Sequence, residues 1–209
     1  MEDRKVAQDQ ASDGAQQSQW ETLLHTAVSH SISGLTQMAG AEIAASGIST
    51  SKVDVKDIPD HAGGAGKLSV GILLAVENKP GFHMALLHSP EAAYAIIDIL
   101  LGQPAGTTTE LGELELSTLG EMGNIMCSFF LNKMAEQTGF ELRTTPPTVR
   151  MDMTGAILDF ILAEIMMEAD EVDLLETTYG TNERKVDGTF IVIPSVHFRE
   201  QALQKGEAA

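Results

Sequence analysis

The sequence predicts a mixed α/β domain built from two related halves. In each half a long amphipathic helix precedes short strand candidates, two of which form a strand–turn–strand unit. Alignment of residues 37–43 with residues 136–142 places Gly40 on Gly139 and Glu42 on Glu141. Both glycines lie where a helix should end, so convergent capping chemistry could explain part of the match. Duplicated halves of this size usually pair about a pseudo-two-fold axis, which would place the two long helices side by side.

The first half is predicted to span about residues 20–106. Residues 1–19, rich in Gln, Asp, Ser and Ala, are predicted to be a disordered leader. The elements expected next are a helix over 19–45, a short strand over 52–58, strands over 68–76 and 82–88, and a helix that ends before Gly102. Ser89 and Pro90 are typical of a helix start, because Ser caps free backbone N–H groups and Pro suits the first helical position.

The second half is predicted to span about residues 110–196. It follows a linker over 103–110 that is rich in Pro, Gly and Thr. The elements expected are a helix over 113–138, a strand over 149–153, a helix over 155–168, and strands over 172–179 and 185–193. Residues 20–196 are thus expected to form one domain, and residues 197–209 a tail.

Charge and composition narrow the classes of partner. The net charge of −17 disfavours nucleic acid and anionic membranes, so recognition should depend on shape and a few specific contacts. No apolar run approaches the roughly 20 residues that span a bilayer, and the N-terminus has no secretory signal pattern. We therefore expect a cytoplasmic protein. The single cysteine, Cys127, cannot form an internal disulfide and is expected to be a small buried thiol.

Four polar residues mark one face of the helix predicted over 113–138. Ser117, Glu121, Asn124 and Ser128 follow one another at steps of four, three and four residues, so they share that face. The opposite side is apolar, as expected for a helix that packs on a core. A carboxylate and a side-chain amide one turn apart could together grip a partner and orient a water molecule.

The first half lacks this pair of residues. In the alignment of the two halves, Thr22 matches Glu121 and His25 matches Asn124, while Ser18 matches the first serine of the motif. We expect His25 to be a solvated or packed histidine, because Thr22 supplies no acidic neighbour.

The pattern Ser117-x3-Glu121-x2-Asn124-x21-Pro146 resembles the active-site signature of the CheC and CheX chemotaxis phosphatases. The resemblance extends from Glu21 to about residue 194. It implies an α/β pseudo-dimer with a central, largely antiparallel sheet and two long motif helices on one exposed face. CheC proteins commonly carry the motif in both halves, whereas this chain has one intact copy.

The resemblance implies a hydrolase that removes phosphate from the phosphoaspartate of a CheY-type response regulator in two-component signalling. Asn124 would orient the attacking water, and Glu121 would pair with a lysine of the receiver domain. Ser117, Ser128 and Pro146 complete the expected partner-binding set, with Pro146 fixing the loop behind the helix. The receiver would supply Mg²⁺, so we expect no cofactor and no metal ion bound by this chain itself. A CheD-type deamidase is a further partner that the resemblance implies.

A second interpretation is a non-catalytic module, either a receiver-binding protein or a flagellar-switch-like adaptor. The intact acid–amide pair favours catalysis. The adaptor interpretation instead predicts binding of the regulator with no change in the lifetime of its phosphate.

Overall fold

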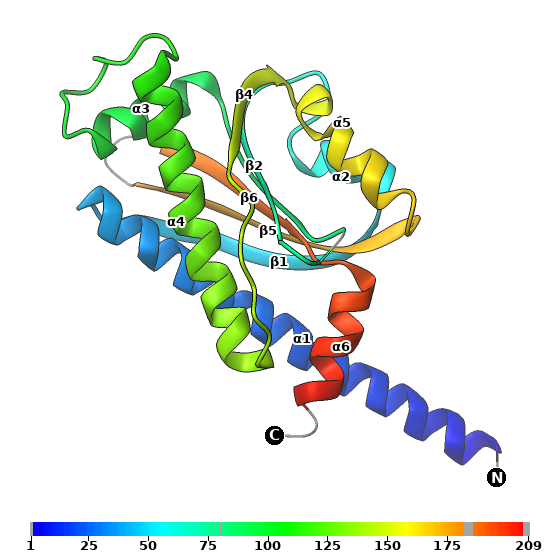
Figure 1. The fold of residues 1–209 in the computed structure, drawn as a ribbon. Coiled ribbons are helices and arrows are strands. Elements are labelled where there is room, and N and C mark those ends of the chain that lie inside the picture. The colour runs from blue at the N-terminus through cyan, green and yellow to red at the C-terminus, as the bar shows by residue number, and fades with distance from the viewer. Residues whose placement is uncertain (1, 80, 182–185, 207–209) are drawn as a thin grey trace.

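A six-stranded sheet forms the centre of the protein in the computed structural model, which describes residues 2–79, 81–181 and 186–206 (Figure 1). The strands are β1 (Ala44–Asp54), β2 (Leu68–Ala75), β3 (His83–His88), β4 (Thr148–Met153), β5 (Glu171–Thr181) and β6 (Val186–Ile193). Their order across the sheet is β1-β5-β6-β3-β2-β4, and every neighbouring pair is antiparallel. The predicted antiparallel α/β fold is confirmed.

The strand order has the symmetry of a duplicated fold. Exchanging β1 with β4, β2 with β5 and β3 with β6 returns the same order read from the other edge. β3 pairs with β6 at the centre, on the pseudo-two-fold axis. β1 pairs with β5 of the second half, whereas β4 pairs with β2 of the first half. Each half therefore donates its first strand to the hairpin of the other half.

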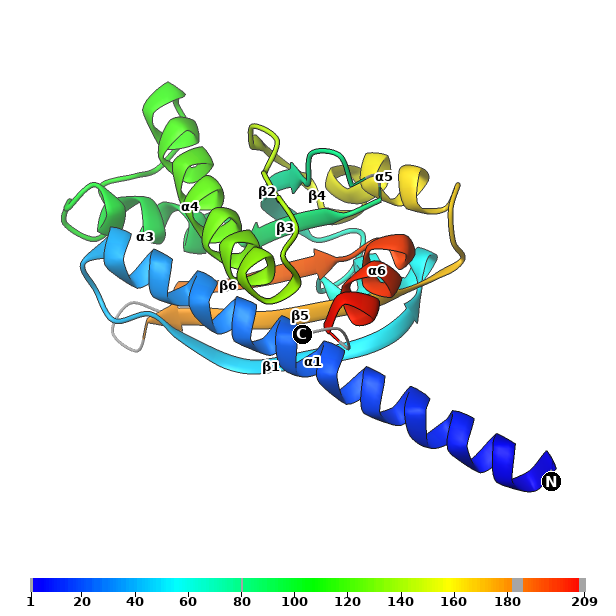
Figure 2. The ribbon, with the colours of Figure 1, turned by 60° about the horizontal axis from the view of Figure 1, so that its bottom comes forward.

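Helices cover both faces of the sheet and make a three-layer structure (Figures 1 and 2). The helices are α1 (Glu2–Ala39), η1 (Val55–Asp57), α2 (Ile58–His61), α3 (Pro90–Leu100), α4 (Glu113–Thr138), α5 (Thr154–Ile165) and α6 (Val196–Gly206). Alternate residues of β3 divide the core: Met84 and Leu86 join the apolar cluster beneath α1, α3, α4 and α6, while Ala85 and Leu87 join the cluster beneath α2 and α5.

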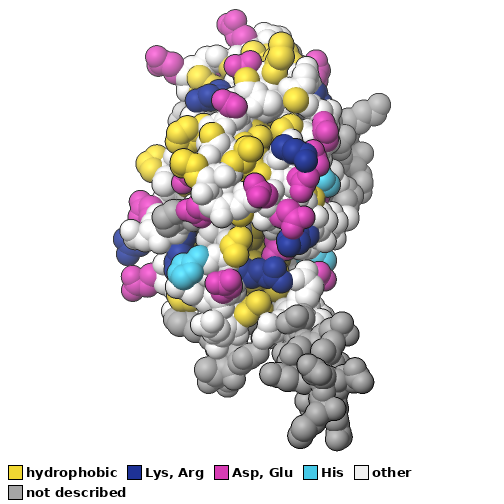
Figure 3. Space-filling view, turned by 90° about the vertical axis from the view of Figure 1, so that its right-hand side faces the viewer, with side chains coloured by type: hydrophobic (Ala, Val, Ile, Leu, Met, Phe, Trp, Pro, Cys, Tyr) yellow, Lys and Arg dark blue, Asp and Glu magenta, His cyan; other side chains and the backbone are white. Residues whose placement is uncertain are grey.

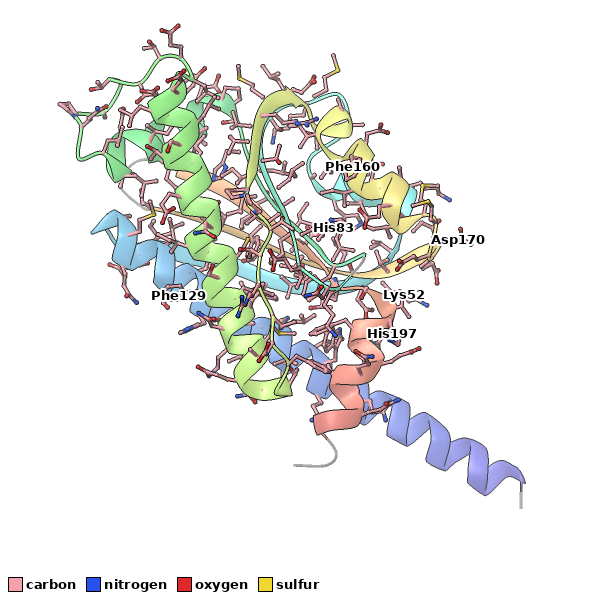
Figure 4. The ribbon with its side chains drawn as sticks, in the orientation of Figure 1. Lys52, His83, Phe129, Phe160, Asp170 and His197 are labelled. Atoms are coloured by element: carbon pink, nitrogen blue, oxygen red, sulfur yellow. The ribbon has the colours of Figure 1, made fainter. Side chains whose placement is uncertain are left out.

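The two long helices α1 and α4 lie side by side on one face, as predicted (Figure 2). The buried Ser31 hydroxyl on α1 donates a 2.7 Å hydrogen bond to the Met126 carbonyl oxygen on α4. Gly34 of α1 faces the ring of Phe129, which Figure 4 labels beside α1, so closely that a Cβ atom would come within 2.7 Å of the ring. The absence of a side chain at residue 34 allows this close crossing.

Capping residues mark the helix ends, and α3 and α4 end as predicted, whereas α1 ends at Ala39 and not at the predicted residue 45. The Ser89 hydroxyl accepts a 3.1 Å hydrogen bond from the backbone N–H of Ala92 at the start of α3. Gly40 and Gly139 adopt φ angles of +61° and +66° at the ends of α1 and α4. This left-handed conformation suits glycine, so part of the match between the halves is capping chemistry.

The predictions for both ends of the chain were wrong. α1 begins at Glu2, so residues 2–19 continue the helix instead of forming a disordered leader. Residues 196–206 form α6, where a tail was predicted. The reason is Phe198, which is fully buried and packs against the rings of Trp20, Phe82 and Phe140. Its partners are far apart in the sequence, so no local pattern indicated this helix.

The first strand was also misplaced. A strand was predicted over 52–58, whereas β1 spans Ala44–Asp54 and residues 55–61 form η1 and α2. Residues 44–52 are mostly small or polar and lack a clear apolar alternation. They become a strand by pairing with β5, from Ala44 opposite Gly180 to Asp54 opposite Glu171.

Candidate functional site

The N-terminal cap of α4 and its close packing on the sheet determine which of its residues face solvent. At its N-terminus the Glu115 carboxylate accepts a 3.0 Å hydrogen bond from the backbone N–H of Gly112, as in a capping box. Further along, Gly123 lies so close to β2 that an added Cβ would be 2.5 Å from Ile72 Cγ2. The helix is thus held tightly to the sheet, and its opposite face points outward.

An open cleft of about 670 Å³ runs along this outward face. One wall is α4 and the other is the loop before β4 together with the end of β2. The cleft is lined by Glu77, Leu116, Ser117, Gly120, Glu121, Asn124, Thr144, Thr145, Pro146, Pro147 and Val149. The structure therefore brings together four of the predicted site residues: Ser117, Glu121, Asn124 and Pro146.

Asn124 is half-buried in the cleft and is held from the opposite wall. The Thr144 hydroxyl donates a hydrogen bond of 3.4 Å to the Asn124 side-chain oxygen Oδ1. This distance is long for an O–H···O bond, so the contact restrains the amide only weakly. Asn124 can therefore be displaced from it by a water molecule or an incoming partner.

Glu121 lies one turn before Asn124, and its side chain is exposed. Among the ion pairs formed by the described residues, none includes this carboxylate. The carboxylate can thus pair with a cation of another molecule without first breaking a bond within this chain.

The loop that forms the second wall is fixed to the end of β2. The backbone N–H of Glu77 donates to the Arg143 carbonyl at 2.8 Å, and the N–H of Thr145 donates to the Ala75 carbonyl at 2.9 Å. The Thr145 hydroxyl also accepts a 3.0 Å bond from the N–H of Ala75. These bonds fix the backbone directly before Pro146, so the predicted part of Pro146 in shaping the loop is consistent with its position.

Two residues differ from the expected site. Ser128 is half-buried and does not line the cleft, although it follows the same helical spacing. Glu77 does line the cleft and was not predicted. It follows β2 in the first half, and only the pairing of β2 with the loop before β4 brings it to the site. No spacing rule in the sequence would have found it.

The corresponding positions of the first half bond within the chain. His25 is half-buried, and its Nε2 lies 3.4 Å from the Thr50 hydroxyl on β1. The Thr22 hydroxyl donates to the Ser18 carbonyl at 2.8 Å. Neither contact provides an acid–amide pair, so these positions of the first half do not reproduce the arrangement of Glu121 and Asn124.

No cluster of three or more His, Cys, Asp or Glu side chains placed to hold a metal ion occurs among the described residues. No described helix is long and apolar enough to cross a membrane. Cys127 is fully buried, as predicted, and burial raises the pKa of its thiol well above the usual value.

Exposed apolar side chains occur on another side of the molecule, around α5 (Figure 3). Phe160 and Met167 are 74% and 80% exposed there. Figure 4 labels Phe160 at α5, which lies apart from α4. This surface is separate from the cleft.

Residues 114–151 match the sequence profile of the CheC-like family, and this stretch contains every residue of the motif from Ser117 to Pro146. Over these residues the chain is similar to the CheC-like family. The chain is 26% identical over 151 residues to the CheY-P phosphatase CheC of Bacillus subtilis (strain 168), covering 71% of this chain and 72% of that relative.

Solved structures share the fold of this chain. FliY of Thermotoga maritima aligns with a TM-score of 0.66 at 16% identity, over 87% of this chain and 90% of FliY. A chain of the CheX–CheY–BeF3–Mg²⁺ complex of Borrelia burgdorferi aligns with a TM-score of 0.53 at 16% identity, over 82% of this chain and 98% of that chain. At these identities the similarity establishes the fold alone.

Proposed function

We propose that this protein is a phosphatase that hydrolyses the aspartyl phosphate of a CheY-type receiver domain. The relative from Bacillus subtilis is named a CheY-P phosphatase, which supports the reaction class. The observation that carries the proposal is the position of Glu121 and Asn124, one turn apart on α4 and lining the same open cleft. A partner protein can bring its own active site to this open face. The proposed reaction then needs no metal ion bound by this chain.

In this mechanism Asn124 enters the receiver's active site and holds a water molecule in line with the phosphorus atom. The water oxygen attacks phosphorus while the bond from phosphorus to the aspartate oxygen breaks, giving a free carboxylate and inorganic phosphate, which retains the water's protons. Asn124 cannot act as a base, but a loose phosphoryl-transfer transition state needs little base assistance. Positioning the water alone lowers the barrier by several kcal/mol, on the order of an effective-molarity effect.

Glu121 fixes the register of the two proteins in the same mechanism. Its carboxylate pairs with the lysine of the receiver that lies near the phosphate, and the Mg²⁺ bound by the receiver stabilises charge on the phosphoryl oxygens. A charge-assisted contact in an occluded interface is stronger than one exposed to solvent. Ser117, one turn further back on α4, contributes a hydroxyl at the edge of the contact.

The test is the decay of ³²P-labelled regulator with wild-type protein, Asn124→Ala and Glu121→Ala, with Ser128→Ala as a matched variant on the same helix but outside the cleft. We expect Asn124→Ala to reduce the dephosphorylation rate by at least a hundredfold and Ser128→Ala to leave it within twofold. If wild type and Asn124→Ala bind the regulator but neither shortens the lifetime of its phosphate, the protein is an adaptor.

A further inference from the structure

The cleft carries two carboxylates on opposite walls. Glu121 projects from α4, and Glu77 follows β2 on the other wall. Both side chains are exposed. None of the described residues that line the cleft is basic, and the whole chain carries a net charge of −17. A partner that pairs with both carboxylates would therefore bring positive charge to both walls.

The backbone at Glu77 is held in place from two directions. Its N–H donates to the Arg143 carbonyl in the loop that also holds Asn124 through Thr144. Two residues later, Lys79 Nζ lies 4.5 Å from the centre of the Phe140 ring and donates a 3.2 Å hydrogen bond to the Gln201 side chain on α6. Cation–π and hydrogen-bond contacts of this kind fix the turn. Glu77 therefore presents its carboxylate from a defined position.

We propose that Glu77 determines specificity, an inference that rests on the proposed function. Its carboxylate pairs with a second cationic side chain, Lys or Arg, on the surface of the receiver. Glu121 takes the lysine beside the phosphate, and Glu77 takes a surface cation that lies across the cleft from it. A receiver with a neutral or acidic residue at that place leaves the Glu77 carboxylate without a partner and is bound less well.

The proposed pairing acts on recognition and not on the chemical step. Glu77 lies on the wall opposite Asn124 and Glu121, away from the helix that would orient the water. It is also exposed, so salt screens its interaction with a partner. A charge at the edge of an interface mainly changes the association rate and its dependence on ionic strength.

The experiment measures steady-state dephosphorylation of a purified CheY-type regulator by the full chain carrying Glu77→Gln. The matched control is Glu42→Gln, which removes one exposed carboxylate outside the cleft and changes the net charge equally. We expect Glu77→Gln to raise KM by about threefold to tenfold at low salt with kcat unchanged, and this difference to shrink at high salt. Glu42→Gln should leave both constants within twofold.

A charge exchange gives the second arm of the test. Glu77→Lys should raise KM further, and one Lys→Glu or Arg→Glu substitution on the receiver surface should restore it for this variant while weakening the wild-type enzyme. The inference is overturned if Glu77→Gln behaves like Glu42→Gln, or if no receiver substitution rescues Glu77→Lys. Failure of the proposed function would look different, because Asn124→Ala would then retain the wild-type rate.

Discussion

The Thr144 hydroxyl donates a 3.4 Å hydrogen bond to the side-chain oxygen of Asn124, joining the loop before β4 to the candidate catalytic helix. Thr144→Val removes this donor and keeps the shape of the side chain. Because the bond is long, we expect only a modest fall in kcat, about threefold to tenfold, with KM unchanged. Steady-state kinetics on labelled regulator measure this, and Thr144→Ser should restore the wild-type kcat. An unchanged kcat in Thr144→Val would show that the contact does not position the amide.

The two halves should differ in catalysis. We expect Glu121→Ala to abolish turnover and His25→Ala to leave it within twofold, because His25 contacts Thr50 and Thr22 supplies no carboxylate beside it. The measurement is the dephosphorylation rate of the same regulator preparation with each variant. Comparable losses from both substitutions would indicate a second working site on α1.

The two glycines on α4 give a matched pair for the packing of the helix. A Cβ at Gly123 would lie 2.5 Å from Ile72 Cγ2, whereas a Cβ at Gly120 would meet Pro147 at an ordinary 3.5 Å. Gly123→Ala should lower the free energy of unfolding by about 1–3 kcal/mol through overpacking. Gly120→Ala should leave it unchanged or raise it by up to about 1 kcal/mol, because Ala favours helix. Urea unfolding of both variants measures this, and equal effects would contradict the close packing of α4 on β2.

Substitution of Phe198 tests whether α6 belongs to the core. The side chain is fully buried, and its ring centre lies 5.0 Å from that of Phe82. Phe198→Ala should lower the free energy of unfolding by about 3–5 kcal/mol. The control, Val196→Ala, changes a side chain on the same helix that is 48% exposed and should have an effect below about 0.5 kcal/mol. A small loss from Phe198→Ala in denaturant unfolding would restore the interpretation of this segment as a tail.

The free energy of unfolding should decrease as the pH falls, because of His88. Burial lowers the pKa of His88 to about 4, and its Nε2 lies 2.7 Å from the Tyr179 hydroxyl. In the unfolded chain the pKa is near 6.5, so the unfolded state binds the additional proton between these values. The contribution is fully present above about pH 6.5 and is lost as the pH falls towards 4, at most about 3 kcal/mol.

Urea unfolding at pH 7 and pH 5 measures this dependence. His88→Gln should flatten it, whereas His197→Gln, which changes an exposed histidine, should not. If His88→Gln keeps the wild-type dependence on pH, other groups cause the loss.

The sequence predicted well those features that local chemistry controls. The bounds of α4 were predicted correctly at both ends, because Gly112 and Gly139 flank a continuous amphipathic helix. The positions of Ser117, Glu121 and Asn124 on one outward face followed from helical spacing.

Features that depend on distant pairing were not accessible from the sequence. β1 becomes a strand through β5, and α6 is held by aromatic residues from both halves. Glu77 reaches the cleft because Ala75 pairs with Thr145. Ser128 had the right spacing, but it does not line the cleft. The division at residues 103–110 and the roles of individual site residues stay predictions.

The exchange of β1 and β4 between the halves has a consequence for the half that lacks the motif. The intact motif lies on α4, but the loop that faces it is bonded to the end of β2, and β4 joins the sheet only by pairing with β2. A fragment that retained the second half alone would lose the strand beside β4 and the bonds that fix the facing loop. The first half, which lacks the motif, is thus an indispensable scaffold, and its removal should abolish the activity proposed for Glu121 and Asn124.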